Sequence, residues 1–510
     1  MTGAEILSVL MVVAVCGLLM AGYPVALTLG GVSLAFAAVG HATGIMTLAL
    51  LGALPQRIFG VMTNEVLLAI PLFVFMGVML ERSRIAEDLL ETMGRLFGTL
   101  RGGLGISVVM VGTLLAAAKG VVGATTVTLG LIVLPTMLRH AYDPRLAAGA
   151  VAATATLAQI FPPAIVLVLL GDQISNAYQS AQLAQGNFAP NSVSVADLFA
   201  GAIVPALALV ALYIVYLAAT AIVRPEQAPA LPPDPKAPRG FAMARRLGEV
   251  LVAPVALILA VLGSILGGLA TPTEAAAVGA VGALLLAARR IERRQTWPID
   301  TAIVALLAAL LLRQGGLTAM APLLTIAAFG TAVALWRLFR DEALTQVAAR
   351  TTQFTSMIFL ILIGATMFSL VFRGLGGDDL VHRALSDLPG GAAAAIVVVM
   401  VAMFLLGFIM DAFEIIFVVV PIVAPVLLQM QGVDPVWLGV LMAVNLQTSY
   451  LTPPFGPTLF FLRGVAPPEI TTRHLYAGAV PFVAIQVGLL LILWFVPGLA
   501  TALPSALYGR

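Results

Sequence analysis

Two stretches of the chain share one skeleton: residues 143–163 have the sequence DPRLAAGAVAATATLAQIFPP, and residues 434–454 have the sequence DPVWLGVLMAVNLQTSYLTPP. In both, an Asp-Pro pair precedes a Pro-Pro pair by 19 residues, and the two copies lie 291 residues apart. A helix cannot continue unbroken through Pro-Pro, because two N–H donors are lost and each ring clashes with the preceding turn. Both pairs interrupt apolar sequence, where freed backbone groups are tolerated only against protein or a solvated cavity. The repeat therefore predicts two broken helices at corresponding places in two halves, as at the binding site of a membrane transporter.

Composition indicates the same class of protein. The 510 residues are 61% hydrophobic and only 10% charged, with a mean hydropathy of +1.07, whereas a soluble domain carries about 25% charged residues. Apolar runs near the about 20 residues that span a bilayer recur along the whole chain. We therefore expect an all-α polytopic membrane protein surrounded by a lipid bilayer. The net charge of +2 gives no indication of nucleic-acid binding.

A polar, proline-rich segment over residues 223–247 divides the chain into two comparable halves, residues 1–222 and residues 248–510. Arginines in the short loops around it place this linker on the cytoplasmic side, because basic residues concentrate in cytoplasmic loops. On the same argument, the polar segment over 172–196, which has no Lys or Arg, is expected to be an external loop. An apolar pair at about 300–337 has no counterpart in the first half, and we interpret it as an inserted helix pair.

Upstream of each Asp-Pro pair, two short apolar stretches meet at small or polar residues, at 119–126 and at 410–414. Each stretch is too short for an ordinary pair of spans joined by a hydrated loop. The expected shape is a re-entrant hairpin that enters and leaves by one face of the membrane. The hairpins are predicted at about 104–138 and about 391–430. The broken helices are predicted to follow them at about 145–172 and about 436–463.

Polar oxygens precede both breaks: Thr154 and Thr156 in the first copy, and Asn445, Gln447, Thr448 and Thr452 in the second. Thr154 aligns with Asn445, and Thr156 aligns with Gln447. Hydroxyl and carboxamide oxygens, together with carbonyls freed by a helix break, suit a hard cation such as Na⁺. The alternative is that these side chains only form hydrogen bonds between helices.

The two predicted hairpin tips differ in chemistry. The first tip contains Gly120, Gly123, Thr125 and Thr126, and free amides at a helix N-terminus favour anions. Lys119 beside it could add a positive charge to an anion site, or could extend to the membrane interface.

The second tip contains two acids, Asp411 and Glu414. A charge at bilayer depth costs about 2.5–3.5 kcal/mol, so these acids indicate a cation or substrate site. In the alternative interpretation, Asp411 caps the helix that starts at Ala412, and Glu414 lies on a hydrated face.

Several absences in the sequence narrow the function. There is no G-x-x-x-x-G-K-[ST] phosphate loop, so ATP hydrolysis by this chain is not expected. The sequence contains no H-E-x-x-H motif or other catalytic dyad, and Cys16 is the single cysteine. We expect a protein that is not an enzyme, has no organic cofactor, and draws energy from an ion gradient or a partner subunit.

Six segments in order along nearly the whole chain resemble one family: residues 70–77, 120–126, 149–163, 271–277, Asp411, and 445–454. The chain resembles the large membrane subunit (M, DctM-type) of the tripartite ATP-independent periplasmic (TRAP) transporters. The resemblance implies an inverted-repeat, elevator-type transporter in a bacterial inner membrane, importing a small organic acid with a Na⁺ gradient. It also implies two partners, a small four-helix membrane subunit (Q type) and a periplasmic solute-binding protein (P type).

The resemblance further implies site roles. One sodium site would use Gly123 and Thr125 of the first tip with Thr154 and Thr156. The other would use Asp411 with Asn445, Gln447, Thr448 and Thr452. Substrate would dock between the tips, against Lys119, Gly120, Gly123, Thr125, Thr126, Asp411 and Glu414.

Two alternatives stay open at this point. A self-sufficient divalent-anion-type carboxylate transporter or exchanger shares the plan of two hairpins, and strong uptake by the large subunit alone would favour it. A channel or an intramembrane enzyme is the other alternative. A channel would conduct without saturation, and an enzyme would need a catalytic dyad.

Overall fold

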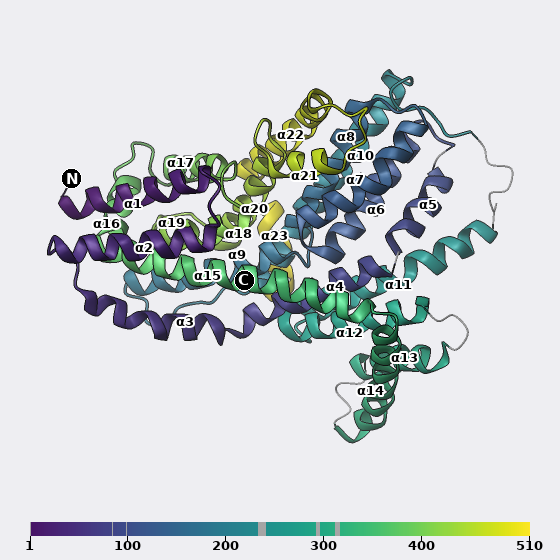
Figure 1. Ribbon diagram of the computed structural model, residues 1–510, viewed down its shortest axis with the longest axis horizontal. Coiled ribbons are helices and arrows are strands. Elements are labelled where there is room, and N and C mark those ends of the chain that lie inside the picture. Colours follow the sequence, from purple (N-terminus) through teal and green to yellow (C-terminus); the bar gives the residue numbers. More distant parts are fainter. Residues whose placement is uncertain are drawn as a thin grey trace.

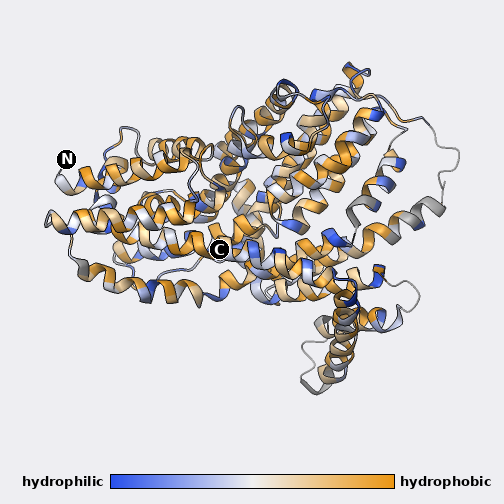
Figure 2. Cartoon of the chain, viewed as in Figure 1, coloured by the Kyte–Doolittle hydropathy of each residue, from blue (hydrophilic) through white to orange (hydrophobic). Residues whose placement is uncertain are grey.

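The computed structural model describes residues 2–83, 85–97, 99–232, 241–291, 296–311 and 317–509, and every regular element in these ranges is a helix. Within them, seven helices are long and apolar enough to cross a membrane. Two further helices, Ala49–Met62 and Glu65–Arg82, meet at a 49° bend and together could form an eighth membrane span. Apolar residues predominate along most of the helices (Figure 2), and many large apolar side chains are exposed; Leu27, for example, is 64% exposed. Apolar outer faces of this kind suit a hydrocarbon environment, and the expectation of a polytopic all-α membrane protein is confirmed.

The Asp-Pro pairs begin the two central helices, α8 (Pro144–Thr156) and α20 (Pro435–Leu451). Asp143 Oδ1 accepts hydrogen bonds from the N–H groups two and three residues further on, at 2.8 and 3.1 Å. Asp434 Oδ1 accepts one from the N–H group three residues further on, at 2.8 Å. Proline at the first helical position loses nothing, since first-turn N–H groups have no partner inside the helix. The repeated Asp-Pro is therefore an N-cap followed by a helix start.

Both central helices break at their Pro-Pro pair. The first ends in a short turn, η3 (Leu157–Gln159), and the chain resumes as α9 (Ile165–Ala184). The second ends at Leu451 and resumes as α21 (Pro457–Val465). Both Pro-Pro peptide bonds are cis. The two predicted helix breaks are present at the expected residues.

A helical hairpin precedes each broken helix. The helices involved are α6 (Gly103–Lys119) and α7 (Val122–Arg139) in the first half, and α17 (Gly391–Leu406), α18 (Ala412–Val418) and α19 (Val420–Leu427) in the second. The first arms, α6 and α17, have 17 and 16 residues, fewer than the about 20 that a perpendicular span requires. Re-entry through one membrane face and elevator motion stay predictions.

The two halves interlock. Helix α22 (Thr472–Phe495) of the second half packs on α8 of the first, and α10 (Val195–Val223) of the first packs on α20 of the second. At the first crossing, a Cβ atom added at Gly149 would lie 2.1 Å from the carbonyl oxygen of Gly478. One added at Gly478 would lie 2.0 Å from the carbonyl oxygen of Arg145. The backbones therefore touch, which only glycine permits.

The remaining described helices belong to the same two halves. They are α1 (Gly3–Met20), α2 (Val25–Ala42), η1 (Leu48–Ala53), α3 (Leu54–Met62), η2 (Glu65–Leu68), α4 (Ala69–Arg82), α5 (Ile85–Phe97), α11 (Phe241–Leu266), α12 (Pro272–Ile291), α13 (Trp297–Leu311), α14 (Leu317–Arg340), α15 (Ala343–Gly374), α16 (Gly377–Ser386) and α23 (Gly498–Tyr508). The long helix α15 packs on α2 and α4, and α4 packs on α12. Helices α13 and α14, at the position of the predicted inserted pair, pack on each other and project from the rest (Figure 1).

Two boundaries differ from expectation. The prediction of an external loop over 172–196 is wrong up to Ala184, because α9 continues to that residue. Ile174, Ala177 and Ala181 are buried at helical spacing while the polar side chains occupy the other face, so the segment is an amphipathic helix. Helix α11 begins at Phe241, inside the predicted linker 223–247; residues 233–240 of that linker lie outside the described residues. The division into two functional halves stays a prediction.

Candidate functional site

The two hairpin tips meet at one cavity of about 690 Å³. Residues 120–124 line it from the first tip, and residues 408–414 line it from the second. Gln159 beside the first helix break and Tyr450 beside the second complete the inner wall. Of the predicted substrate residues, Gly120, Gly123, Asp411 and Glu414 are therefore brought together around one space.

The chain turns at a glycine in the first hairpin tip. Gly120 has a φ of +62°, a left-handed conformation that glycine adopts without steric cost. A Cβ atom at Gly123 would lie 3.2 Å from the ring of Phe461, so the backbone passes close to α21. The first N–H groups of α7 have no partner inside the helix, and residues 122–124, which carry them, line the cavity. The first tip thus brings the start of α7 to the cavity wall.

Thr125 and Thr126 do not line this cavity. Both are fully buried, and their hydroxyl groups donate to carbonyl groups one turn earlier, at 2.9 and 2.8 Å. The structure gives these two threonines a helix-stabilising position rather than a place on the cavity wall. A role in substrate or sodium binding stays a prediction for both.

Lys119 does not line the cavity, and its side chain is only 3% exposed. Its Nζ lies 3.1 Å from Glu81 Oε2 and donates to Thr128 Oγ1 at 2.6 Å. A separate space of about 20 Å³ lies beside it. Helix α4 is tightly apposed here, because a Cβ atom at Gly77 would lie 2.8 Å from the Lys119 Cα atom. Lys119 therefore neither extends to an interface nor lines the cavity; its charge is balanced by Glu81.

The second tip is organised by a capping box. Asp411 Oδ1 accepts from Ala412 N–H at 2.8 Å, and Asp411 N–H donates to Glu414 Oε2 at 2.9 Å. The same Ala412 N–H also donates to Tyr450 Oη at 2.8 Å, which ties the tip to α20. The capping alternative for Asp411 is thus observed. The Asp411 side chain also accepts from the Glu414 N–H, and both acids line the cavity.

A buried amide cluster joins the two central helices. Gln447 Nε2 on α20 donates to Thr156 Oγ1 on α8 at 3.2 Å, and Gln486 Nε2 on α22 donates to the same oxygen at 3.2 Å. Gln486 Nε2 also donates to Tyr213 Oη at 2.7 Å. Within the described residues, Gln447 Oε1, Gln486 Oε1 and Thr154 Oγ1 are buried and accept no hydrogen bond. An unsatisfied buried acceptor costs about 1–3 kcal/mol, so these neutral oxygens are suited to water or to a hard cation.

Other predicted sodium ligands on α20 are engaged in hydrogen bonds. Asn445 Nδ2 donates to Met400 O of α17 at 2.8 Å. Thr448 Oγ1 and Thr452 Oγ1 each donate to a carbonyl one turn earlier, at 2.8 and 2.7 Å. These residues do not line the cavity with Asp411. The structure shows their structural hydrogen bonds, and their sodium role stays a prediction.

Six polar cavity residues were not predicted from the sequence: Glu81 on α4, Thr128 on α7, Gln159 at the first break, Arg350 and Gln353 on α15, and Tyr450 on α20. Glu81 and Arg350 lie in segments with no counterpart in the duplicated skeleton, so the repeat gives no reason to select them. Gln159 was detectable as an amide three residues before the first Pro-Pro pair, and its Oε1 is buried without a hydrogen-bond partner among the described residues. Gln486 was also detectable, as a lone amide within an apolar run.

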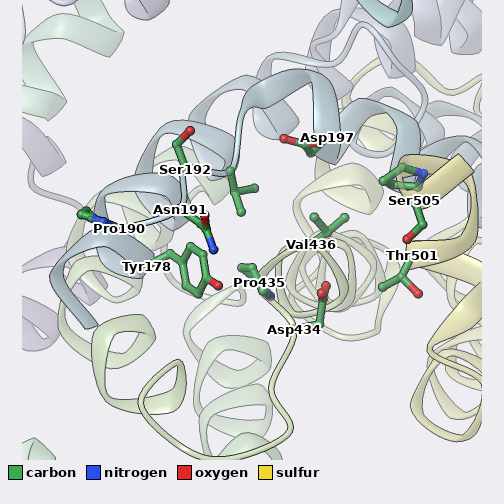
Figure 3. Close-up of a pocket in the computed structure, with 12 residues that line it drawn as sticks. Tyr178, Pro190, Asn191, Ser192, Asp197, Asp434, Pro435, Val436, Thr501 and Ser505 are labelled. Atoms are coloured by element: carbon green, nitrogen blue, oxygen red, sulfur yellow. The ribbon is translucent and has the colours of Figure 1, made fainter. Parts of the chain in front are cut away.

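A second cavity of about 590 Å³ lies near the C-terminal helix α23. Figure 3 shows Asp197 and Asp434 on its walls, with Tyr178 and Asn191 at one side and Thr501 and Ser505 at the other. Both acids are occupied as helix caps, since Asp197 Oδ2 accepts from Ser194 N–H at 2.7 Å and Asp434 caps α20. No group of three or more His, Cys, Asp or Glu side chains suited to a metal ion occurs among the described residues. The cavity between the hairpin tips is the stronger candidate site.

Comparison with known proteins shows the family of the chain. The family model described as "Tripartite ATP-independent periplasmic transporter, DctM component" matches residues 11–499. The chain is 28% identical to the C4-dicarboxylate TRAP transporter large permease protein of Vibrio cholerae serotype O1, covering 98% of each chain. It is 25% identical to the sialic acid TRAP transporter large permease protein of the same organism, covering 97% of each.

Among solved structures, the YdaH transporter of Alcanivorax borkumensis shares the fold, with a TM-score of 0.56, 16% sequence identity and 89% of each chain covered. The family match extends over the hairpins, both broken helices and the helices that pack on them. The chain therefore belongs to the DctM component family of the tripartite ATP-independent periplasmic transporters.

Proposed function

We propose that this chain is the large permease subunit of a Na⁺-driven, binding-protein-dependent importer of small organic acids in a bacterial inner membrane. The observation that carries the proposal is the convergence of both hairpin tips and both helix breaks on one cavity of about 690 Å³. That volume is within the range of small-molecule sites, about 300–1,000 Å³. A cavity at the meeting point of two related halves is the usual location of a transporter's substrate.

The donor set favours Na⁺ as the coupling ion. Two separate groups of oxygens are on hand: Gln447, Gln486 and Thr154 offer buried neutral oxygens without donors within the described residues, and Asp411 and Glu414 offer carboxylates at the cavity wall. Hard cations prefer oxygen ligands of these kinds. Bound Na⁺ would supply positive charge that holds the tips closed around an anionic substrate.

The two hairpins and broken helices would move together as an elevator, past the helices that include α4 and α15. The packing of α7 on both α8 and α21 supports this, because it joins the first hairpin to both broken helices. The family description implies two further components, a periplasmic solute-binding protein that delivers substrate and a small membrane subunit. Substrate identity would then be set largely by the binding protein.

The test is reconstitution of the chain in proteoliposomes with its small membrane subunit and a loaded binding protein. We expect uptake only with an inward Na⁺ gradient and with all components present. Unchanged uptake after the Na⁺ gradient is collapsed would remove sodium from the proposal. Strong uptake by the large subunit alone would instead support the self-sufficient carboxylate transporter.

A further inference from the structure

One face of α15 lines the cavity together with the hairpin tips. Arg350, Gln353, Phe354 and Met357 all line the cavity. Their spacing of three, four and seven residues places them on one side of a helix. The wall is therefore polar at its N-terminal end and apolar for the next turn.

The charge at the polar end is only partly balanced. Arg350 Nη1 lies 4.0 Å from Glu81 Oε1, while Glu81 Oε2 lies 3.1 Å from the buried Nζ of Lys119. One carboxylate thus lies between two cations and is closer to Lys119. The Arg350 side chain is 55% exposed, so its guanidinium keeps donors available to a ligand in the cavity.

The rest of the lining sets the polarity of a ligand. Among the described residues on the cavity wall, Arg350 is the one with a positive side chain, whereas Glu81, Asp411 and Glu414 are acidic. Phe354, Met357, Phe408, Phe461 and several valines make up much of the remainder. A second carboxylate on the ligand would find apolar side chains or like charge at the far end.

We propose that Arg350 and Gln353 form the carboxylate-binding end of the cavity, and that the cavity is built for an organic anion with one carboxylate and an apolar body. This rests on the proposed function, because it assigns the substrate class to the same cavity. The guanidinium fork matches a carboxylate in two parallel hydrogen bonds, and the Gln353 amide can donate a third. The apolar body then extends along Phe354 and Met357 toward Phe461.

Binding can be measured without any ion gradient. The chain, with its small membrane subunit, is placed in lipid nanodiscs in saturating NaCl, and ligand affinity is read from the shift in thermal unfolding. The probes are hexanoate, its neutral analogue hexanamide, and the dicarboxylate adipate. We expect hexanoate to bind at least about tenfold more tightly than either of the others, as loss of a charge-assisted contact predicts.

Matched variants assign the effect to Arg350. Arg350→Gln should remove the preference for hexanoate over hexanamide. Arg350→Lys should keep part of this preference, because the lysine ammonium group supplies a point charge. The control is Arg373→Gln on the same helix, since Arg373 pairs with Asp378 at 3.0 Å and does not line the cavity. It should bind hexanoate as the unaltered protein does.

Two results would overturn the inference: an undiminished preference for hexanoate in Arg350→Gln, or adipate binding as tightly as hexanoate. If Arg350→Gln is poorly folded, Gln353→Leu replaces it and should weaken hexanoate more than hexanamide. Equal weakening of both probes in that variant would also count against the subsite. Absence of Na⁺-driven uptake with intact hexanoate preference would reject the transport proposal and leave the subsite standing.

Discussion

Replacing Glu81 by glutamine should destabilise the protein through Lys119. The ammonium group of Lys119, in a side chain 3% exposed, would lose the carboxylate that lies 3.1 Å away. Removing one partner of a buried ion pair costs about 3–5 kcal/mol, because the other charge is left without compensation. The Glu81 side chain is 29% exposed, so solvent screening reduces this cost. We expect the free energy of unfolding to fall by about 2–3 kcal/mol.

The measurement is a double-mutant cycle on equilibrium unfolding in mixed micelles, followed by helical circular dichroism. Lys119→Met keeps the apolar stem of the side chain and removes its charge, so the Glu81→Gln, Lys119→Met double variant should recover most of the stability. Arg350→Gln is the control, expected to cost under about 1 kcal/mol because its pair with Glu81 is exposed. Simple additivity of the two single costs would refute the reasoning.

Three further outcomes are expected. Gly149→Ala should lower the free energy of unfolding by about 1–3 kcal/mol, since the new methyl group meets a backbone oxygen. The control is Gly488→Ala on α22, which has open space and should be neutral or stabilising. Equal unfolding midpoints for the two variants would contradict the predicted clash. In proteoliposome uptake, Asp411→Asn and Asn445→Ala should each weaken Na⁺ dependence without loss of membrane expression, and full activity in both would count against a sodium role. Gln486→Leu should cost about 1–2 kcal/mol in the same unfolding assay, because it removes two buried hydrogen bonds; unchanged stability would show that the amide cluster does not join the halves.

Local backbone chemistry explains why the sequence predicts the broken helices well. A side-chain cap at Asp143 or Asp434 and a proline ring that blocks a helical turn act within a few residues. The same holds for the turn at Gly120. The capping box of Asp411 with Glu414 is also local, at a spacing of three residues, and a sequence pattern can show it.

The prediction of a loop over 172–196 is wrong for a different reason. Its polar composition is typical of a loop, but three small or apolar residues recur at helical spacing, Ile174, Ala177 and Ala181. They are buried against neighbouring helices, and this packing outweighs the average polarity of the segment. Only the pattern of burial, which depends on those neighbours, distinguishes the amphipathic helix from a loop.

Composition thus specified the class of protein. The duplicated skeleton specified the two breaks, and the short apolar stretches upstream of it specified the two tips; breaks and tips follow from short-range sterics and hydrogen bonding. Which charged side chains pair with each other was decided by tertiary packing. Lys119, Glu81 and Arg350 come from three helices, and only their assembly shows that Lys119 is paired and Arg350 faces the cavity. Coulombic and hydrogen-bond energies act between atoms that are near in space, whatever their separation in sequence, and a repeat in the chain does not encode that proximity.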